Sequence, residues 1–200
     1  MSTAVAMNST DTISEPLAQR PKRADALRNY ELLIATARAA FAETGTATSM
    51  EEIARRAHVG IGTLYRHFPT RQALLEAVYL EELEGVCRSA ADHSELPPWE
   101  ALTGWLHEFV RYAGTKRALA DELLTYMDVN AEVFARCRAA LYAAARPLLE
   151  HAQREGVVRD DVELTEVVSM VSAIAKMPSD DPAQTHRILD VALDGLRYRA

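Results

Sequence analysis

Four side chains that can bind a phosphate or a base edge lie close together near the amino end of the chain: Thr63, Tyr65, Arg66 and His67. A guanidinium can donate two hydrogen bonds to the N7 and O6 atoms of guanine, while hydroxyl and imidazole groups donate to phosphate oxygens. Gly62 precedes them and lets the backbone approach base edges. This combination predicts a short segment that reads double-stranded DNA.

The residues around this group have the pattern of two short helices joined by a turn. Ser49 and Glu52 have the spacing of a capping box, in which the serine hydroxyl accepts from the third helical amide and the glutamate reaches back. Apolar residues at helical spacing predict the buried faces, namely Met50, Ile53, Ala54 and Ala57 in the first helix and Ile61, Leu64, Tyr65 and Phe68 in the second. Pro69 then ends the second helix. The pattern is that of a helix-turn-helix, whose second helix enters the major groove.

Another helix and a basic arm precede this motif. A helical pattern from Ala24 to Glu43, ended by Gly45, completes a three-helix DNA-binding domain over residues 24–70. Residues 1–23 have the composition of a disordered arm. The arm ends in the basic cluster Arg20–Arg23, which either contacts a minor groove or phosphates, or only adds solubility.

Further phosphate contacts are expected where helices begin. Ser49 caps the first helix of the motif, and Thr70 and Arg71 open the next long helix. Helix amino ends attract anions because their first amides have no partner within the helix. Arg55 and Arg56 are instead expected to be solvated or paired with nearby carboxylates.

The net charge of −7 is divided unevenly along the chain. Residues 20–71 carry 9 Lys and Arg against 5 Asp and Glu, a net charge of +4, whereas residues 72–200 carry 13 against 22, a net charge of −9. Salt screens charges beyond roughly 8–10 Å, so the local field governs contact with DNA. The acidic remainder disfavours binding in the wrong orientation.

Several features indicate a cytoplasmic protein with no membrane partner. Residues 1–19 lack the positive charge and the sustained apolar core of a signal peptide. No run of about 18 apolar residues suggests a membrane span. Cys87 and Cys137 are therefore expected to be reduced thiols rather than a disulfide.

The segment Val59–Phe68, followed by Pro69, Thr70 and Arg71, closely resembles the tetracycline-repressor (TetR) family of bacterial transcription regulators. The resemblance is specific over about Tyr30 to Tyr79. It assigns Leu64 and Phe68 to the core of the small domain and Thr63, Tyr65, Arg66 and His67 to the DNA side. His58 stands where many members carry glycine, and histidine tolerates a left-handed conformation better than a β-branched residue does.

Residues 71–200 are predicted to form a larger helical ligand-binding and dimerisation domain, which gives an all-α protein of about nine helices. Gly114 marks a break between two of them, and Pro147 a kink or restart within another. Asp181, Pro182 and Gln184 have the pattern of the start of the last helix.

The last two helices carry a wide apolar surface, which predicts burial against a second subunit as well as against their own chain. The alternative is a wholly internal helix pair. In the family these helices form a four-helix dimer bundle, so the resemblance implies a homodimer. The residues concerned are Val167, Val168, Met170, Val171, Ile174, Ile188, Leu189, Val191, Ala192, Leu193 and Leu196.

The resemblance also implies a small-molecule pocket among the middle helices. The composition of the candidate lining favours an apolar or aromatic effector, although each residue is also an ordinary core residue. The candidates are Leu102, Leu106, Phe109, Leu123, Tyr126, Met127, Phe134, Cys137, Leu141 and Met170, with Trp105, His107, Tyr112 and Tyr142 as possible polar groups. Ligand binding is expected to shift the long fourth helix and so to release the DNA operator.

Two other classes of protein are the alternatives to a DNA-binding regulator. An enzyme is disfavoured because the sequence lacks H-E-x-x-H, P-loop, G-x-S-x-G and C-x-x-C motifs, so no catalytic residue, metal site or cofactor is expected. A helical protein-interaction adaptor without sequence-specific DNA binding is the alternative. It would have no use for the Thr63, Tyr65, Arg66 and His67 group.

Overall fold

The computed structural model describes residues 20–126, 131–178 and 181–197, with the side chains at 46, 114–134 and 182 excepted. Over these ranges the chain is all-helical, as predicted, apart from an isolated bridge between Val158 and Arg197. The elements are α1 (Ala24–Thr44), the 3₁₀ turn η1 (Gly45–Ala47), α2 (Met50–Arg56), α3 (Ile61–His67), α4 (Arg71–His93), α5 (Pro98–Tyr126), α6 (Ala131–Arg154), α7 (Leu164–Ala175) and α8 (Pro182–Asp194).

Eight α-helices are described, close to the predicted number of about nine. The break predicted at Gly114 is wrong. Helix α5 continues through this residue from Pro98 to Tyr126. A glycine inside a helix costs only about 1 kcal/mol relative to alanine. Helix α5 packs against α4, α6, α7 and α8, and this packing outweighs the local penalty. Helix α6 likewise continues past Pro147 without a restart.

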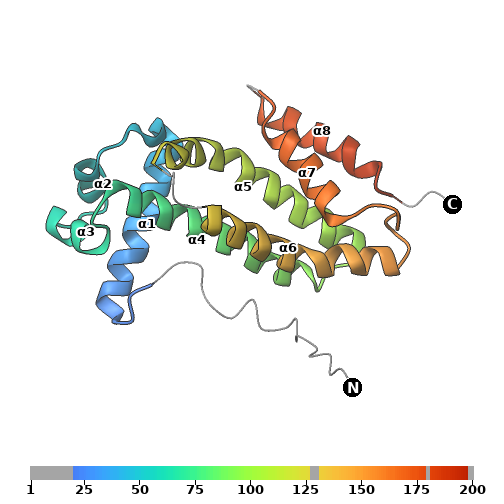
Figure 1. The fold of residues 1–200 in the computed structure, drawn as a ribbon, viewed down its shortest axis with the longest axis horizontal. Helices are drawn as coiled ribbons and strands as arrows, with labels where there is room; N and C mark the ends of the chain where they lie inside the picture. Colours follow the sequence, from blue (N-terminus) through green and yellow to red (C-terminus); the bar gives the residue numbers. More distant parts are fainter. Residues whose placement is uncertain (1–19, 127–130, 179–180, 198–200) are drawn as a thin grey trace, which may run out of the picture.

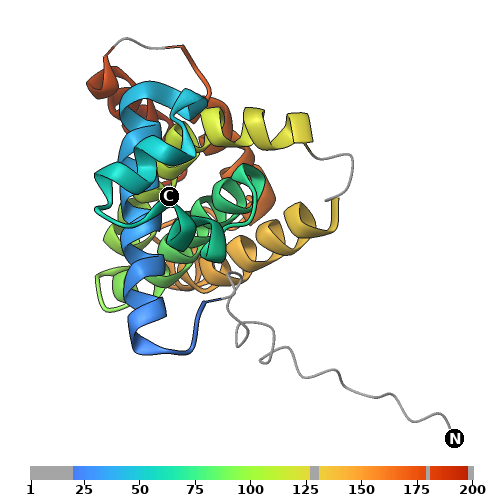
Figure 2. The same cartoon turned by 90° about the vertical axis from the view of Figure 1, so that its left-hand side faces the viewer.

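Helices α1, α2 and α3 form a small head at one end of the long helix α4 (Figures 1 and 2). The core of the head is made by Leu33, Ile34, Ala37 and Phe41 of α1 with Ile53 and Ala54 of α2, Leu64 of α3 and Phe68. Helix α1 also packs against α4, so the head is joined to the rest of the chain along this helix as well as through the connection after α3.

The turn between α2 and α3 has the left-handed conformation considered for it. His58 has φ of 53°, and it is the one residue other than glycine with positive φ in the part of the chain that is described. Left-handed backbone costs an L-residue roughly 1–2 kcal/mol, less for residues whose polar side chain bonds locally. The turn is kept because Ala57 and Leu64 on either side are buried in the head.

Helices α5 and α6 lie along α4, and α7 and α8 pack against α5 to complete the larger body (Figure 1). Its most deeply buried large side chain is Trp105 of α5, whose indole Nε1 donates to the Val86 carbonyl of α4 over 3.0 Å. Phe109 stacks on the same ring at 5.5 Å. Helices α4 and α5 approach so closely that a Cβ at Gly104 would lie 2.8 Å from the His93 ring. These contacts join α4 and α5 closely within the body.

Candidate nucleic-acid interface

Helix α3 presents one face to solvent and the other to the head. Leu64 is fully buried, whereas Ile61 and Tyr65 are 41 and 42 % exposed and Arg66 is exposed beside them. The prediction that Ile61 and Tyr65 lie on the inner face is therefore wrong. Helix α3 has only seven residues, so one buried side chain on it, Leu64, is enough to hold it against the head together with the following Phe68. Ile61, which sequence reasoning assigned to the core, joins the exposed surface.

The Arg66 side chain lies back along α3. Its Nε donates to the Gly62 carbonyl over 3.2 Å, and its Nη2 donates to the Thr63 hydroxyl over 3.0 Å. Thr63 is half-buried, and Gly62 is exposed. A Cβ built on Gly62 meets no atom within 4 Å, so nothing in the described part of the chain requires glycine there. These residues form a shallow polar surface that leaves room for another molecule.

His67 lies at the end of α3 and is half-buried. Its ring packs against Tyr30 of α1, with centroids 6.4 Å apart, and against Phe68 at 6.2 Å. Burial, followed by the charge of Arg66, lowers the pKa of the imidazole below its usual range. At neutral pH His67 is therefore an uncharged ring that can donate one N–H.

Two helix amino ends lie beside α3 in the sequence, and both are capped by their own side chains. The Ser49 hydroxyl accepts from the Glu52 amide and the Thr70 hydroxyl from the Ala73 amide, each over 3.1 Å. Ser49 and Thr70 are exposed. Arg71, in contrast, is half-buried: it donates to the Thr48 carbonyl, and its guanidinium lies 5.8 Å from the centre of the Phe41 ring. Arg71 thus ties the start of α4 to the head.

The prediction that Glu52 reaches back to the start of α2, as in a capping box, is wrong. The Glu52 carboxylate accepts from Arg55 over 2.8 and 2.7 Å and from Arg56 over 2.7 Å. These hydrogen bonds lower the pKa of Glu52 to about 2. Arg56 also donates to Glu43 over 2.6 Å. The pairing of Arg55 and Arg56 with nearby carboxylates is therefore confirmed.

The basic cluster before α1 is divided. Arg20 forms ion pairs with Glu81 and Glu84 of α4, whereas Lys22 and Arg23 are exposed. The sequence contained no signal for this pairing because the partners are 61 and 64 residues apart. Residues 1–19 of the arm lie outside the described residues.

The residues predicted to bind an effector lie in the core of the body where they are described. Leu102, Leu106, Phe109, Cys137 and Leu141 are buried, and Met170 is half-buried. The side chains of Leu123, Tyr126 and Phe134 and the whole of Met127 lie outside the described residues. Seven of the eleven apolar residues predicted for the last two helices are already buried within the chain: Val167, Val168, Val171, Ile174, Leu189, Leu193 and Leu196.

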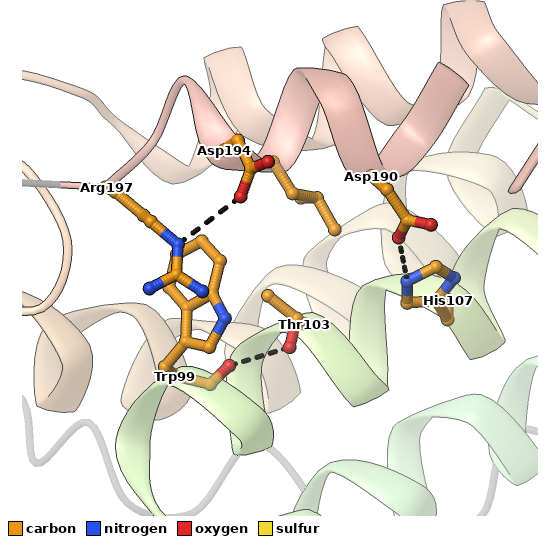
Figure 3. A pocket seen from close by; sticks show the side chains of 7 residues that line it. Trp99, Thr103, His107, Asp190, Asp194 and Arg197 are labelled. Carbon is orange, nitrogen blue, oxygen red and sulfur yellow. Dashed lines mark hydrogen bonds and ion pairs between the residues drawn. The ribbon is translucent and has the colours of Figure 1, made fainter. Parts of the chain in front are cut away.

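A hollow of about 240 Å³ lies elsewhere, between α5 and α8 (Figure 3). On one side His107 Nε2 contacts Asp190 Oδ1 at 3.0 Å. On the other, Arg197 lies over the Trp99 ring at 4.1 Å and donates to Asp194 over 3.3 Å. Of the residues considered for effector binding, only His107 lines it. The lining comprises Trp99, Thr103, His107, Asp190, Leu193, Asp194 and Arg197.

Family models match both parts of the chain. The model for bacterial regulatory proteins of the tetR family matches residues 33–78, and the model for the C-terminal domain of SbtR-like transcriptional regulators matches residues 97–198. No helix in the described ranges is both long enough and apolar enough to cross a membrane.

Solved structures show the same likeness over most of the chain. The TetR transcriptional regulator SCO0520 from Streptomyces coelicolor is 38 % identical, with a TM-score of 0.75 over 86 % of this chain and 99 % of that one. A TetR transcription regulatory protein from Mycobacterium vanbaalenii is 36 % identical, with a TM-score of 0.70 over 88 and 99 %. PfmR from Thermus thermophilus, at 21 % identity and a TM-score of 0.60 over 82 and 96 %, shares the fold.

Proposed function

Since this chain belongs to the tetR family of bacterial regulatory proteins and is a DNA-binding transcriptional regulator, we propose that it represses transcription by binding a palindromic operator as a homodimer. The DNA-binding domain comprises residues 24–70, and residues 71–200 bind the effector and the second subunit. A small apolar or aromatic ligand releases the operator. The observation that carries the proposal is the exposed face of α3 with Tyr65 and Arg66 on it.

The DNA contacts are assigned by chemistry and exposure. Arg66 leaves its bonds to Gly62 and Thr63 and donates to a guanine, while Tyr65 and His67 donate to phosphates. An uncharged His67 serves this purpose because a phosphate oxygen accepts from a neutral N–H. The complete set is Ser49, Gly62, Thr63, Tyr65, Arg66, His67, Thr70 and Arg71, of which Arg71 acts while it remains bound to the Thr48 carbonyl.

Selection of bound fragments from a random pool of DNA duplexes tests reader and symmetry together. The expected result is an enriched palindrome whose half-site centres lie about 34–36 Å apart, bound by two chains. Enrichment of a single asymmetric site bound by one chain would contradict the dimeric arrangement. Binding that depends on salt but not on DNA sequence would contradict the specific reading by α3.

Replacing Gly62 with alanine is expected to separate binding from stability. The added methyl group meets nothing in the chain, and alanine favours the helix by about 0.5–1 kcal/mol, so thermal stability stays the same or rises. The same methyl group lies where the backbone of α3 approaches the bases, so operator affinity falls on the order of tenfold, equivalent to about 1.4 kcal/mol. Thermal unfolding and operator titration measure the two effects. Equal affinity of the alanine variant would place the DNA away from Gly62.

The homodimer is proposed to form through α7 and α8. Val191 of α8 is 75 % exposed within one chain. Ile188 and Ala192 of the same helix and Met170 of α7 are half-buried. A branched apolar side chain so exposed on a helix favours contact with another protein surface. The seven apolar residues already buried within the chain leave a narrower interface than the sequence indicated, centred on α8.

Replacing Val191 with glutamate is expected to shift the protein from dimer to monomer, raising the dimer dissociation constant on the order of 100-fold. The physical reason is that dimerisation would then bury an unpaired carboxylate. Analytical ultracentrifugation measures the change, and Ala139→Glu on an exposed position of α6 is the matched control. Dimers of unchanged strength in the Val191 variant would place the interface elsewhere.

The effector is proposed to bind among α4 to α7, near Leu102, Leu106, Phe109, Cys137, Leu141 and Met170. Opening this core moves α4 and with it the head, so that the two α3 helices no longer match their half-sites. A ligand can act in this way only through a difference in affinity between the two shapes. Isothermal titration of the free and the operator-bound dimer tests the mechanism, and equal ligand affinities would rule it out.

A further inference from the structure

Arg20 precedes α1 in sequence, yet its side chain lies against the middle of α4. Its Nε donates to Glu81 Oε1 over 2.7 Å, and its Nη2 donates to Glu81 Oε2 over 2.5 Å and to Glu84 Oε2 over 3.0 Å. The side chains of Arg20, Glu81 and Glu84 are 29, 11 and 14 % exposed. A two-pronged, partly buried pair of this kind is stronger and less screened than an exposed ion pair.

Helix α1, which follows Arg20, supports the end of α3 through aromatic contacts. Tyr30 of α1 is buried, and its ring packs against Phe68 at 5.4 Å and against His67 at 6.4 Å. Burial, followed by the charge of Glu81, raises the pKa of Tyr30 to about 12. The Tyr30 ring therefore joins α1, whose first turn follows Arg20 in sequence, to the end of α3.

A second ion pair joins the same two helices. Arg38 of α1 contacts Glu82 of α4 at 2.5 Å. The carboxylates on this stretch of α4, Glu81, Glu82 and Glu84, thus all have arginine partners from the region before or within α1. Without Arg20, Glu81 and Glu84 would repel each other three residues apart on a mostly buried face of α4.

We propose that Arg20 is a positioning residue that sets the angle between the DNA-binding head and α4, and that it does not contact DNA itself. The proposal rests on the proposed dimeric operator binding. In a dimer, rotation of each head on its α4 changes the distance between the two α3 helices. Arg20 therefore acts on the spacing of half-sites that the dimer accepts rather than on the bases that it reads.

The test compares Arg20→Ala with Arg23→Ala, an exposed arginine of the same cluster. Operator affinity is measured over a range of salt concentrations on the selected operator and on versions with one base pair added or removed between half-sites. For Arg20→Ala we expect affinity for the selected operator to fall about 3- to 10-fold, and the preference over the altered spacings to shrink. The slope of log affinity against log salt stays as in the wild type. Arg23→Ala leaves the spacing preference unchanged.

Two outcomes of the operator measurements overturn the proposal. A salt slope reduced by about one in Arg20→Ala would make Arg20 a phosphate contact. An unchanged spacing preference would mean that the pair does not position the head. The exchange Arg20→Glu with Glu81→Arg restores an ion pair and is expected to recover the preference that Arg20→Glu alone loses. Should Arg20→Ala fail to fold, Arg20→Lys takes its place, because lysine keeps the charge but cannot form the two-pronged hydrogen bond. The same ratio of affinities, selected operator over altered spacings, is then measured.

Hydrogen exchange in the free protein tests, without an operator, whether the Arg20 ion pair holds the head against α4. Arg20→Ala is expected to speed amide exchange in α1 and α3 but not in α7, and Arg23→Ala to change neither. A wild-type protein that binds no palindrome would overturn the proposed function. Faster exchange confined to the head of Arg20→Ala would still support the positioning role of Arg20. Unchanged exchange in α1 and α3 of Arg20→Ala would overturn the positioning role of Arg20, whatever the result of the DNA measurements.

Discussion

Replacing Arg66 with alanine is expected to lower operator affinity roughly 5- to 150-fold, equivalent to about 1–3 kcal/mol, and to relax the preference at one base-pair position. Among the described residues of the free protein, the guanidinium donates to the Gly62 carbonyl and the Thr63 hydroxyl on its own helix. Both are weak, exposed contacts that a guanine can replace with two hydrogen bonds in the major groove. Titration against the selected operator and its single-base substitutions measures affinity and preference together.

Tyr65→Phe is the matched control on the same face of α3. The phenol is 42 % exposed, and a lost phosphate contact weakens binding equally on every DNA sequence. Arg66→Ala should therefore change the order of preferred bases, whereas Tyr65→Phe should not. A uniform loss in Arg66→Ala would move this arginine to the phosphate contacts.

Replacing Trp105 with alanine is expected to lower the free energy of unfolding by about 3–5 kcal/mol. The indole is fully buried, stacks on Phe109 at 5.5 Å and donates to the Val86 carbonyl across the α4–α5 contact. Alanine leaves a cavity at the centre of the body and removes this hydrogen bond. Denaturant unfolding followed by circular dichroism measures the loss.

Trp105→Phe separates the two contributions. Phenylalanine keeps the aromatic packing but cannot donate to the Val86 carbonyl, so a smaller loss of about 1–3 kcal/mol is expected. Both variants should keep operator affinity at temperatures where they are folded, because Trp105 lies in the body and not in the head. A loss below about 1 kcal/mol in the alanine variant would show that the body repacks around the site.

The local features of the head could be predicted because they depend on neighbours in sequence. A side chain such as Ser49 or Thr70 caps the helix that begins at the next residue, and both caps are found. The cap by Asp181 at the start of α8 follows the same rule, with the Ala183 amide 2.9 Å away. The buried Leu64 and Phe68 follow from helical spacing in the same way.

The candidate DNA-binding set was predicted from residue type, which does not tell which of its members are exposed and which are buried. Helical spacing placed Ile61 and Tyr65 inside, yet both are about 40 % exposed. Spacing tells which residues share a face but not how wide a face the neighbouring helices cover. In the head, Leu64 and Phe68 with Tyr30 already fill that contact.

By itself, the sequence determined the helical composition, the caps, the turn at His58 and the family motif, because these depend on interactions within a few residues. Only the tertiary structure decided that α5 continues through Gly114, that Arg20 pairs with Glu81 and Glu84, and that most apolar residues of α7 and α8 are buried within one chain. These outcomes depend on packing and charge between segments distant in sequence. Packing and ion pairs between distant segments outweigh the helix propensity of a single residue such as Gly114, so a pattern of neighbouring residues could not predict them.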